Sequence, residues 1–339
     1  MTADEAGARV GDHAAPPIVS VVIPTCWRTD LLAQCLSSIL AQTVADIELI
    51  VVVDGPDDGT AGYLSAVDDP RVRFAVHPES RGVSSARNAG IDLATGHWLA
   101  FCDDDDVWAP TKLEAQLGAL AARPEARWAI VGEVRFRDGA SEVSCTRAPT
   151  PDVVASELPF SNVVPAGCSG VVAERELVIE VGSFDPDVSV LADRDLWIRL
   201  NWRSPVAAVP DPLVGYRDHD GAMTRRLRRL EDELDAMRDK YRDRLDESET
   251  FPSDRFYIWA YRRTFSSGDP RGGLDFLVRS SRFRRAILRW YLSRLRRRLG
   301  RNADPEPEPR HRQGDAPITD FPWLVEALGR HEITGRSHP

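Results

Sequence analysis

The 339-residue sequence lacks the patterns that would assign it to several common protein classes. Its five cysteines are an odd number with no Cys-x-x-Cys pair, which excludes a regular disulfide framework and a ribbon-type zinc site and favours a reducing, cytoplasmic location. No run of 18 uncharged apolar residues occurs, so we expect no membrane-spanning helix, and the first 17 residues lack the apolar core of a signal peptide. Neither Gly-x-Gly-x-x-Gly nor Gly-x-x-x-x-Gly-Lys-Ser/Thr is present, so dinucleotide-binding and P-loop sites lack their signatures.

Basic residues are scarce relative to acidic ones, and the formal net charge is −10. This balance argues against nucleic-acid binding through an overall basic surface. The segment 279–301 is the exception, since it carries ten arginines and no acidic residue. Its arginines are interspersed with aromatic and aliphatic residues such as Trp290 and Leu295, which leaves two interpretations: peripheral contact with an anionic membrane at its inner face, or packing on the acidic domain. We favour the second.

Strand-like and helix-like runs alternate four times between residue 18 and about residue 120. The strands are expected as apolar, β-branched runs at 18–23, 47–53, 72–76 and 97–102. The helices between them repeat apolar residues every three or four positions, with Asp30 expected as a cap and Pro110 in a first turn. This alternation predicts βαβ units and an α/β fold with a mostly parallel, Rossmann-like central sheet flanked by helices.

The whole chain divides into four expected regions: a flexible N-terminus at 1–16, a main domain at 17–222, a helical extension at 223–300 and a Pro-rich, disordered tail at 301–339. Within the tail, the apolar patch at 321–328 is able to pack back on the domain. Apolar residues at 227–245 step by three and four, which fits a long helix packed on its own domain or the coiled coil of a homodimer. We favour the packed helix.

Polar side chains follow the expected strands, at the edge where parallel α/β sheets bind ligands. Thr25 follows the first strand, Asp54 the second, and four aspartates, Asp103–Asp106, the fourth. Adjacent carboxylates repel and favour a counter-cation, for which Mg²⁺ or Mn²⁺ shared with substrate phosphates is suited. The alternatives are an acidic surface turn for the four aspartates and a simple turn residue for Asp54. Arg87 opens a helix, where it can contact phosphate or form a structural ion pair.

Six segments follow one another between about residues 18 and 220: VSVVIPT, VVVDG, SRGVSSARNAG, FCDDDDVWAPTKLEAQL, GSFD and DRDLWIRL. Taken in this order, they resemble the family 2 glycosyltransferases, which have the GT-A fold. The sequence departs from the family pattern in three places. Cys26-Trp27 replaces a Tyr-Asn pair, Ser80 replaces an asparagine, and Ala192 replaces the first acid of a Glu-Asp pair.

The resemblance implies a role for each matching residue. The nucleotide-sugar-binding residues that it implies are Pro24, Thr25, Asp54, Arg87, Asp103 and Asp104. Asp105 and His219 match the positions of metal ligands, although the family's histidine can instead approach the diphosphate. Asp193 matches the catalytic base, and the alternative interpretation is an N-cap of the helix that follows it.

The activity implied is transfer of a sugar from a nucleotide-diphosphate sugar, most often a UDP-sugar, to an acceptor hydroxyl with inversion. Mg²⁺ or Mn²⁺ is the implied cofactor, and the products would belong to polysaccharide, glycolipid or secondary-metabolite glycosylation. Two other functions remain open: a sugar-1-phosphate nucleotidyltransferase, and a non-catalytic carbohydrate-binding or scaffold protein. The first usually has a glycine-rich nucleotide loop near its N-terminus, which this sequence lacks.

Overall fold

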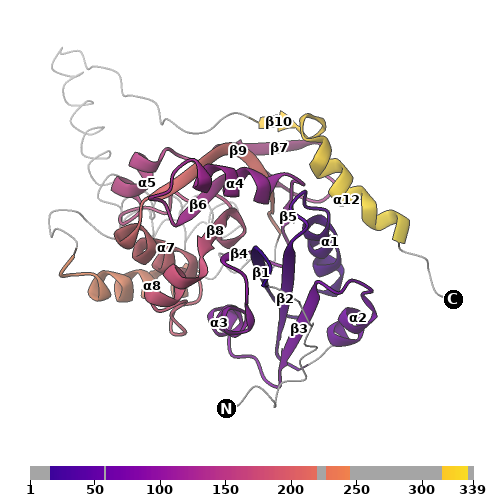
Figure 1. Cartoon of the computed structure of the whole chain (residues 1–339), viewed down its shortest axis with the longest axis horizontal. Coiled ribbons are helices and arrows are strands. Elements are labelled where there is room, and N and C mark those ends of the chain that lie inside the picture. The colour runs from indigo at the N-terminus through magenta and orange to yellow at the C-terminus, as the bar shows by residue number, and fades with distance from the viewer. Residues whose placement is uncertain (1–15, 57–58, 220–226, 245–314, 335–339) are drawn as a thin grey trace, which may run out of the picture. The chain divides into compact units, whose positions relative to one another are not determined.

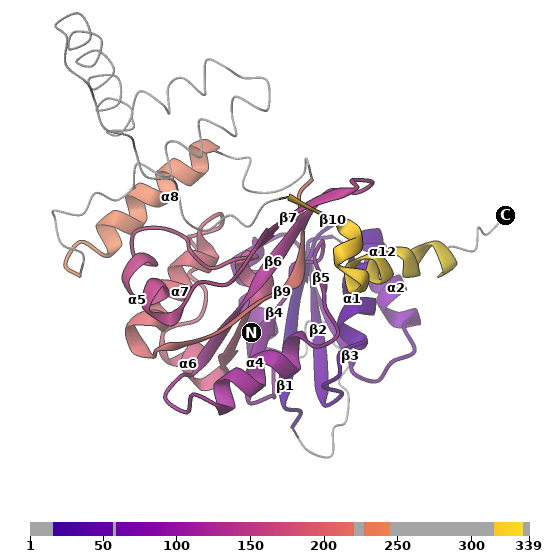
Figure 2. The same ribbon diagram turned by 90° about the horizontal axis from the view of Figure 1, so that it is seen from above.

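The centre of the protein is one mixed β-sheet flanked by helices (Figures 1 and 2). The computed structural model describes residues 16–56, 59–219, 227–244 and 315–334. The strands are β1 (Val19–Thr25), β2 (Ile47–Asp54), β3 (Val72–His77), β4 (Trp98–Phe101), β5 (Val107–Trp108), β6 (Trp128–Phe136), β7 (Glu142–Thr146), β8 (Val171–Glu174), β9 (Val206–Arg217) and β10 (Asp315–Pro317). Their main order is β10-β7-β6-β8-β4-β1-β2-β3, and β9 pairs with both β5 and β6.

The four strands predicted from the first third of the sequence form the parallel half of the sheet. β1 pairs in parallel with β2 and β4, and β2 with β3. Every residue of β1 and β2 is buried, as expected for uninterrupted apolar strands covered on both faces. The carboxyl ends of these strands therefore meet at one edge of the sheet.

The second half of the sheet differs from the prediction of a mostly parallel arrangement. β8 pairs antiparallel with β4 and β6, and β7 pairs antiparallel with β6. The connection between β6 and β7 spans only 137–141, and a connection this short permits a hairpin but not a parallel crossover. The α/β prediction is therefore confirmed, whereas the sheet as a whole is mixed.

The helices that accompany the sheet are α1 (Thr29–Leu40), α2 (Thr60–Ala66), α3 (Val83–Leu93), α4 (Lys112–Ala121), α5 (Pro151–Glu157), α6 (Arg175–Glu180), α7 (Ala192–Arg203) and α12 (Pro322–Thr334), with short 3₁₀ turns η1 (Gly167–Gly170) and η3 (Ile318–Asp320). Two of these helices do not begin at the residue that the sequence predicted. Asp30 lies in the first turn of α1 and not at its N-cap, which is Arg28. Pro110 precedes Thr111, the N-cap of α4, and so lies outside the first turn.

Aromatic packing fixes α7 against the middle of the sheet. The Trp197 ring stacks on Trp128 of β6, with centroids 6.3 Å apart, and lies 6.1 Å from the Phe101 ring at the end of β4. Phe184 packs edge-on against Phe101 at 5.2 Å. This cluster brings the start of α7 close to the carboxyl end of β4.

The C-terminal residues 315–334, which we call the C-terminal segment, fold back on the sheet. β10 pairs antiparallel with β7, and α12 packs against α1 and β5. α12 lies beside α1 in both views (Figures 1 and 2). The prediction of a disordered tail is therefore wrong for 315–334, because apolar residues such as Leu324 are buried there. The expected packing of 321–328 on the domain is confirmed.

The described chain divides into two compact units. Of the described residues, 159–162 and 227–244 belong to the second unit, and the others belong to the first. The second unit contains α8 (Leu227–Lys240), where Leu234 and Met237 are buried. The choice between a packed helix and a homodimer at 227–245 stays a prediction, and the predictions for 279–301 lie outside the described residues.

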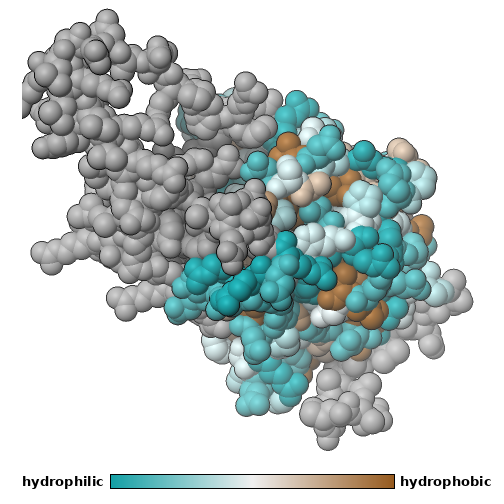
Figure 3. Space-filling model, turned by 90° about the vertical axis from the view of Figure 1, so that its left-hand side faces the viewer, coloured by the Kyte–Doolittle hydropathy of each residue, from teal (hydrophilic) through white to brown (hydrophobic). Residues whose placement is uncertain are grey.

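The described surface offers little continuous apolar area. The face drawn in Figure 3 is largely hydrophilic, with hydrophobic residues in small, separate patches. The large apolar side chains that are exposed in the described part of the chain lie far apart in the sequence or in separate segments: Ile18, Trp27, Ile179 and Val325. Within the described ranges, every helix is too short or too polar to cross a bilayer.

Candidate functional site

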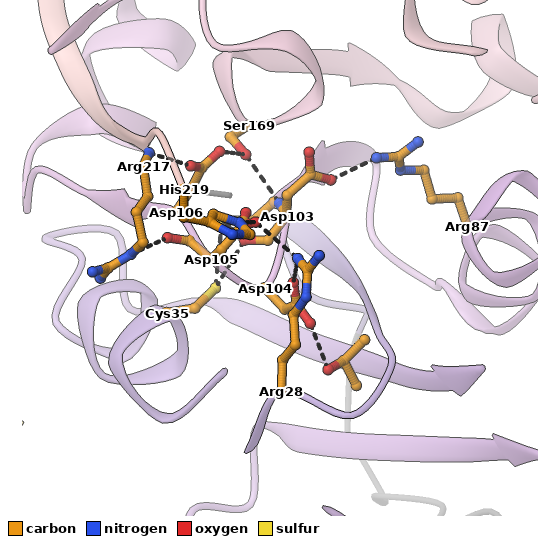
Figure 4. A network of polar contacts seen from close by, with 12 residues as sticks. Arg28, Cys35, Arg87, Asp103, Asp104, Asp105, Asp106, Ser169, Arg217 and His219 are labelled. Carbon is orange, nitrogen blue, oxygen red and sulfur yellow. Dashed lines mark hydrogen bonds and ion pairs between the residues drawn. The ribbon is translucent and has the colours of Figure 1, made fainter. Parts of the chain in front are cut away.

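The four aspartates after β4 form a turn, which we call the acidic turn (residues 103–106), facing the end of β1. Thr25 ends β1, and its hydroxyl donates a hydrogen bond of 2.7 Å to Asp104. Arg28 precedes α1, and its Nη1 lies 3.2 Å from Asp104 and 2.9 Å from Asp105 (Figure 4). Two neighbouring strand ends thus meet through one hydroxyl and one guanidinium.

Asp103 and Asp105 of the turn also contact an arginine and a histidine from other parts of the sheet. Arg87, in α3, donates a 2.5 Å hydrogen bond to Asp103. His219 follows β9, and its Nε2 lies 2.8 Å from the same Asp105 oxygen that Arg28 contacts (Figure 4). The parallel and antiparallel halves of the sheet therefore both contribute to the site.

The fourth acid, Asp106, is buried and holds the turn in place. It accepts a 2.6 Å hydrogen bond from the Ser169 hydroxyl and a 3.0 Å bond from the Arg217 backbone N–H. The Ser169 hydroxyl in turn accepts a bond from the backbone N–H of Asp103, and the Arg217 side chain donates to the Asp105 carbonyl. Asp106 is thus a structural anchor, while Asp103 and Asp105 remain partly exposed.

The turn carries more negative charge than its own partners stabilise. Burial and the charge of Asp105 raise the pKa of Asp104 to about 7, against the opposing effects of Arg28 and Thr25. Burial also raises the pKa of Asp106 well above its usual range, with further contributions from Asp105 and Asp103. A crowded set of carboxylates of this kind favours binding of an added cation.

Asp54, at the end of β2, has a different environment. Its carboxylate accepts hydrogen bonds from His77, the Ser80 hydroxyl and the backbone N–H groups of Arg81 and Gly82, all between 2.8 and 2.9 Å. Burial alone would raise the pKa of Asp54, but these donors outweigh it, and the pKa is lowered. All four lone-pair positions of the carboxylate are used within the protein, so Asp54 fixes the 77–82 loop.

Asp193 lies in the first turn of α7, whose N-cap is Leu191, so the N-cap alternative for Asp193 is wrong. Its carboxylate accepts a 2.7 Å hydrogen bond from the next backbone N–H, that of Arg194. Burial raises the pKa of Asp193, although this hydrogen bond and the positive charge of Arg87 oppose the shift. A carboxylate whose pKa is raised is a better proton acceptor at neutral pH.

The short turn η1 connects Asp193 with the acidic turn. A Cβ atom on Gly167 would lie 3.2 Å from an Asp193 carboxylate oxygen, and Ser169, two residues later, bonds to Asp103. Ala166 and Gly167 both have positive φ angles, of 55° and 50°. A left-handed alanine is strained, and strain of this kind is retained mainly where the surrounding structure requires it.

The residues suggested for a metal form a pair. Among the described residues, no three His, Cys, Asp or Glu side chains lie close enough together to hold a metal ion on their own. Asp105 and His219 nevertheless place one carboxylate oxygen and one imidazole nitrogen 2.8 Å apart. Mg²⁺ is commonly held by one or two carboxylates, with substrate phosphates and water as the other ligands. The pair therefore fits an ion whose coordination a bound diphosphate completes.

Most of the residues suggested by sequence lie in one network. Thr25, Arg87, Asp103, Asp104, Asp105 and His219 meet at the acidic turn, and Asp193 reaches it through η1. Asp54 lies in the separate network at 77–82. Pro24 is buried within β1, opposite Val52.

Three residues of the network carried no strong sequence signal: Arg28, Ser169 and Arg217. Arg28 directly follows a predicted strand, and Arg217 lies two residues before His219, but neither position by itself indicates a contact. Trp27, beside Arg28, is 64% exposed, has a φ of 54° and donates a 3.3 Å hydrogen bond to the Pro56 carbonyl. Its indole therefore lies between the ends of β1 and β2.

Comparisons with known proteins place the N-terminal part of the chain in a family. Residues 20–143 match the family model for glycosyl transferase family 2. A glycosyltransferase of Rickettsia felis is 27% identical over 263 residues, covering 75% of this chain and 43% of the relative. The UDP-Glc:alpha-D-GlcNAc-diphosphoundecaprenol beta-1,3-glucosyltransferase WfgD of Escherichia coli is 32% identical over 103 residues, covering 30% of this chain and 41% of WfgD. The chain thus spans about two fifths of these curated relatives.

A solved structure extends the likeness to nearly the whole chain at the level of fold. The mannosyltransferase PcManGT of Pyrobaculum calidifontis, in complex with GDP-Man and Mn²⁺, superimposes with a TM-score of 0.53 and 18% identity, covering 97% of this chain and 90% of that one. The mixed sheet with its flanking helices is thus the GT-A fold predicted from the sequence. Residues 20–143 thus match the family 2 glycosyltransferase model, and the sheet around them has the GT-A fold.

Proposed function

We propose that this protein is an inverting glycosyltransferase that moves a sugar from a nucleoside-diphosphate sugar to an acceptor hydroxyl. A UDP-sugar is the donor that we favour. The observation that carries the proposal is the meeting of two carboxylate sites at η1, where Gly167 lies against Asp193 and Ser169 bonds to the acidic turn. A displacement at the sugar carbon needs a group that takes the acceptor proton and a second group that stabilises the leaving diphosphate. The two sites would supply these functions, and both border η1.

Asp193 is the proposed general base. It is partly buried at the start of α7, and burial raises its pKa toward the range in which a carboxylate accepts a proton effectively. The single hydrogen bond from the Arg194 N–H, to Oδ1, orients the carboxylate. Oδ2 is the oxygen that lies against Gly167, where a residue with a side chain would crowd it. We assign the proton transfer to this oxygen.

The acidic turn is the proposed donor site. Asp105 and His219 would hold Mg²⁺ or Mn²⁺, and the bound ion would supply Lewis-acid stabilisation of the charge on the leaving diphosphate. Asp103 and Asp104 would face the ribose and sugar, and Arg87 orients Asp103. The Mn²⁺ in the PcManGT complex supports a divalent ion without fixing its identity.

The nucleotide is proposed to lie along the ends of β1 and β2, beside Pro24, Thr25 and Asp54. Because the Asp54 oxygens are already occupied by four donors, we assign Asp54 the shaping of the 77–82 loop in addition to its suggested contact with the base. WfgD, whose name specifies a UDP-Glc donor and a diphosphoundecaprenol-linked acceptor, supports a uridine nucleotide and a role in polysaccharide or glycolipid synthesis. Membrane contact through 279–301 and a homodimer through 227–245 stay predictions.

The test compares Asp193→Asn with Asp187→Asn, an exposed acid a few residues before α7. Each full-length variant is incubated with Mn²⁺ and a panel of UDP- and GDP-sugars, and donor binding is measured by thermal shift. We expect Asp193→Asn to retain donor binding and to lose roughly 10²- to 10⁴-fold in transfer. Asp187→Asn should retain both.

Turnover of Asp193→Asn near the level of the unsubstituted protein would show that the base assignment is wrong. Release of pyrophosphate from a nucleoside triphosphate would instead support the nucleotidyltransferase. Absence of a shift with every donor would support a non-catalytic protein.

A further inference from the structure

The C-terminal segment contributes one fully buried side chain to the sheet, that of Leu324 in α12. Leu324 packs in a cluster with Val107 of β5, Val134 and Phe136 of β6, and Val143 of β7. The segment is held there independently by the pairing of β10 with β7 and by a 2.9 Å hydrogen bond from the Ile318 N–H to the Ser141 carbonyl. Leu324 is thus a fixed part of the domain.

Leu324 lies directly behind a backbone pair that supports the acidic turn. Val107 pairs with Gly215 across the β5–β9 ladder. A Cβ atom added at Gly215 would lie 2.8 Å from Leu324 Cδ1 and 2.8 Å from Val107 Cγ2. Glycine is therefore needed at this position for the leucine to pack against the ladder.

The acidic turn ends at Asp106, directly before the same pair. Val107 directly follows Asp106, and Gly215 precedes Arg217 by two residues. The Arg217 N–H donates to the Asp106 carboxylate at 3.0 Å, and its Nε donates to the Asp105 carbonyl at 2.9 Å. β5 and β9, the two strands that hold the turn, thus contact Leu324 within two residues of these hydrogen bonds.

A second connection runs through a side chain. Phe136, which packs in the Leu324 cluster, also lies under the Arg217 guanidinium, 4.8 Å from ring centroid to Cζ. The guanidinium makes further contacts to Asp138 and Gln34. Displacing Phe136 would therefore disturb the residue that ties β9 to the acidic turn.

We propose that Leu324 is a positioning residue for the acidic turn, supplied by a segment that lies far outside the family-matched residues 20–143. It acts through the Val107–Gly215 pair and through Phe136, and it touches neither donor nor metal. The inference takes its functional meaning from the proposed donor site, whereas the structural coupling itself is independent of it.

The first experiment compares Leu324→Ala with Val325→Ala in the full chain. Val325 is the next residue of the same helix and is 45% exposed, so it controls for helix propensity and position. Hydrogen exchange is followed by mass spectrometry for peptides over 103–110, 212–219 and 47–54. We expect Leu324→Ala to raise exchange at 103–110 and 212–219 at least tenfold and to leave 47–54 within twofold. Val325→Ala should leave all three unchanged.

The second experiment combines Leu324→Ala with Gly215→Ala. Gly215→Ala alone places a methyl group against Leu324 and should also accelerate exchange at 103–110. In the Leu324→Ala background that methyl group meets less crowding, so its added effect should fall at least threefold. Strictly multiplicative effects would overturn the proposed contact.

Binding of UDP with Mn²⁺ links the coupling to function. We expect Leu324→Ala to weaken UDP–Mn²⁺ binding at least fivefold by calorimetry, while Val325→Ala binds like the unsubstituted protein. Equal acceleration of all three peptides, or no acceleration at 103–110, would overturn the positioning role. Failure of the unsubstituted protein to bind UDP would instead count against the proposed function, because the exchange measurements need no ligand.

Discussion

Asp54 and the acidic turn follow β2 and β4, the two strands that flank β1, yet their carboxylates are stabilised to different degrees. Asp54 accepts four hydrogen bonds, and its pKa is lowered in spite of burial. Asp106 is more deeply buried, accepts two hydrogen bonds and lies among three other acids, and its pKa is raised. The number of donors, set against burial and nearby charge, decides the direction of the shift.

This difference separates two uses of acidic residues at one sheet edge. A carboxylate that is saturated by protein donors is a fixed structural charge, and it stabilises the loop that surrounds it. A carboxylate that lies among other acids and accepts few hydrogen bonds is unfavourable in its charged form until a cation binds beside it. The acidic turn therefore has unfavourable electrostatics that a ligand can relieve, whereas the Asp54 pocket does not.

The largest expected effect is that of Asp54→Ala, which leaves His77, the Ser80 hydroxyl and the N–H groups of Arg81 and Gly82 without their acceptor. We expect the free energy of unfolding at pH 7 to fall by about 3 kcal/mol, as measured by urea denaturation. Ser80→Ala removes only one of the four donors and should cost about 1 kcal/mol.

The same variant has a defined pH dependence. Because the pKa of Asp54 is lowered on folding, its stabilisation is present above the unfolded value of about 4 and is lost as the pH falls through the folded value. The gap between the unsubstituted protein and Asp54→Ala should therefore close below about pH 4. A gap that stayed constant down to pH 3 would contradict the lowered pKa.

Lys112 extends the comparison to a buried cation with few partners. It is fully buried, donates one 2.8 Å hydrogen bond to Gln116, and lies 3.7 Å from the centroid of the Trp108 ring. Burial lowers its pKa to about 7. Between that value and the usual lysine value, the unfolded chain binds a proton that the folded chain does not, so stability should rise with pH.

Lys112→Met should abolish this pH-dependent contribution and raise stability by about 2 kcal/mol at pH 7, with the gain shrinking by pH 9. Thermal unfolding between pH 6 and 9 provides the measurement. Lys240→Met, a change at an exposed lysine in α8, is the matched control and should leave the pH profile unchanged. Loss of stability by Lys112→Met at pH 7 would show that the contacts with Gln116 and Trp108 outweigh the burial.

The smallest expected effect is the most direct contrast, since it applies one substitution to both regions. In EDTA at pH 8, Asp106→Asn should raise the free energy of unfolding by about 1 kcal/mol, because it replaces an acid whose charged form is disfavoured by burial and by the neighbouring carboxylates. Asp54→Asn should lower stability, because the new amide N–H₂ faces hydrogen-bond donors. Chemical denaturation of the two variants in parallel tests the signs, and changes of the same sign would contradict the comparison.

The sequence predicts the parallel half of the sheet well because its signals are local. Val19–Thr25 and Ile47–Asp54 are largely apolar runs that end in polar residues, and each run can be recognised from a few consecutive positions. The antiparallel pairing of β8 between β4 and β6 was missed, because it depends on which faces meet in three dimensions.

The candidate site was predictable to a similar extent. Asp103–Asp106 are recognisable as four consecutive acids after an apolar run, and Asp193 was identified through the family resemblance. Arg217, in contrast, bonds to Asp106 across 111 residues, and Leu324 packs in one cluster with Val107, which lies 217 residues earlier in the chain (324 − 107). No local pattern encodes contacts of this range, and neither side chain carries a chemical signature that would single it out.

The return of the C-terminal segment closes the outer edge of the sheet. Asp315, Ala316 and Pro317 of β10 pair with β7, and Leu324 is buried in the cluster that β7 shares with β5 and β6. Removal of residues 315–334 would therefore leave the outer edge of β7 unpaired and would expose the Val107 side of the cluster to water. Protection of this sheet edge and support of the acidic turn thus come from the same twenty residues.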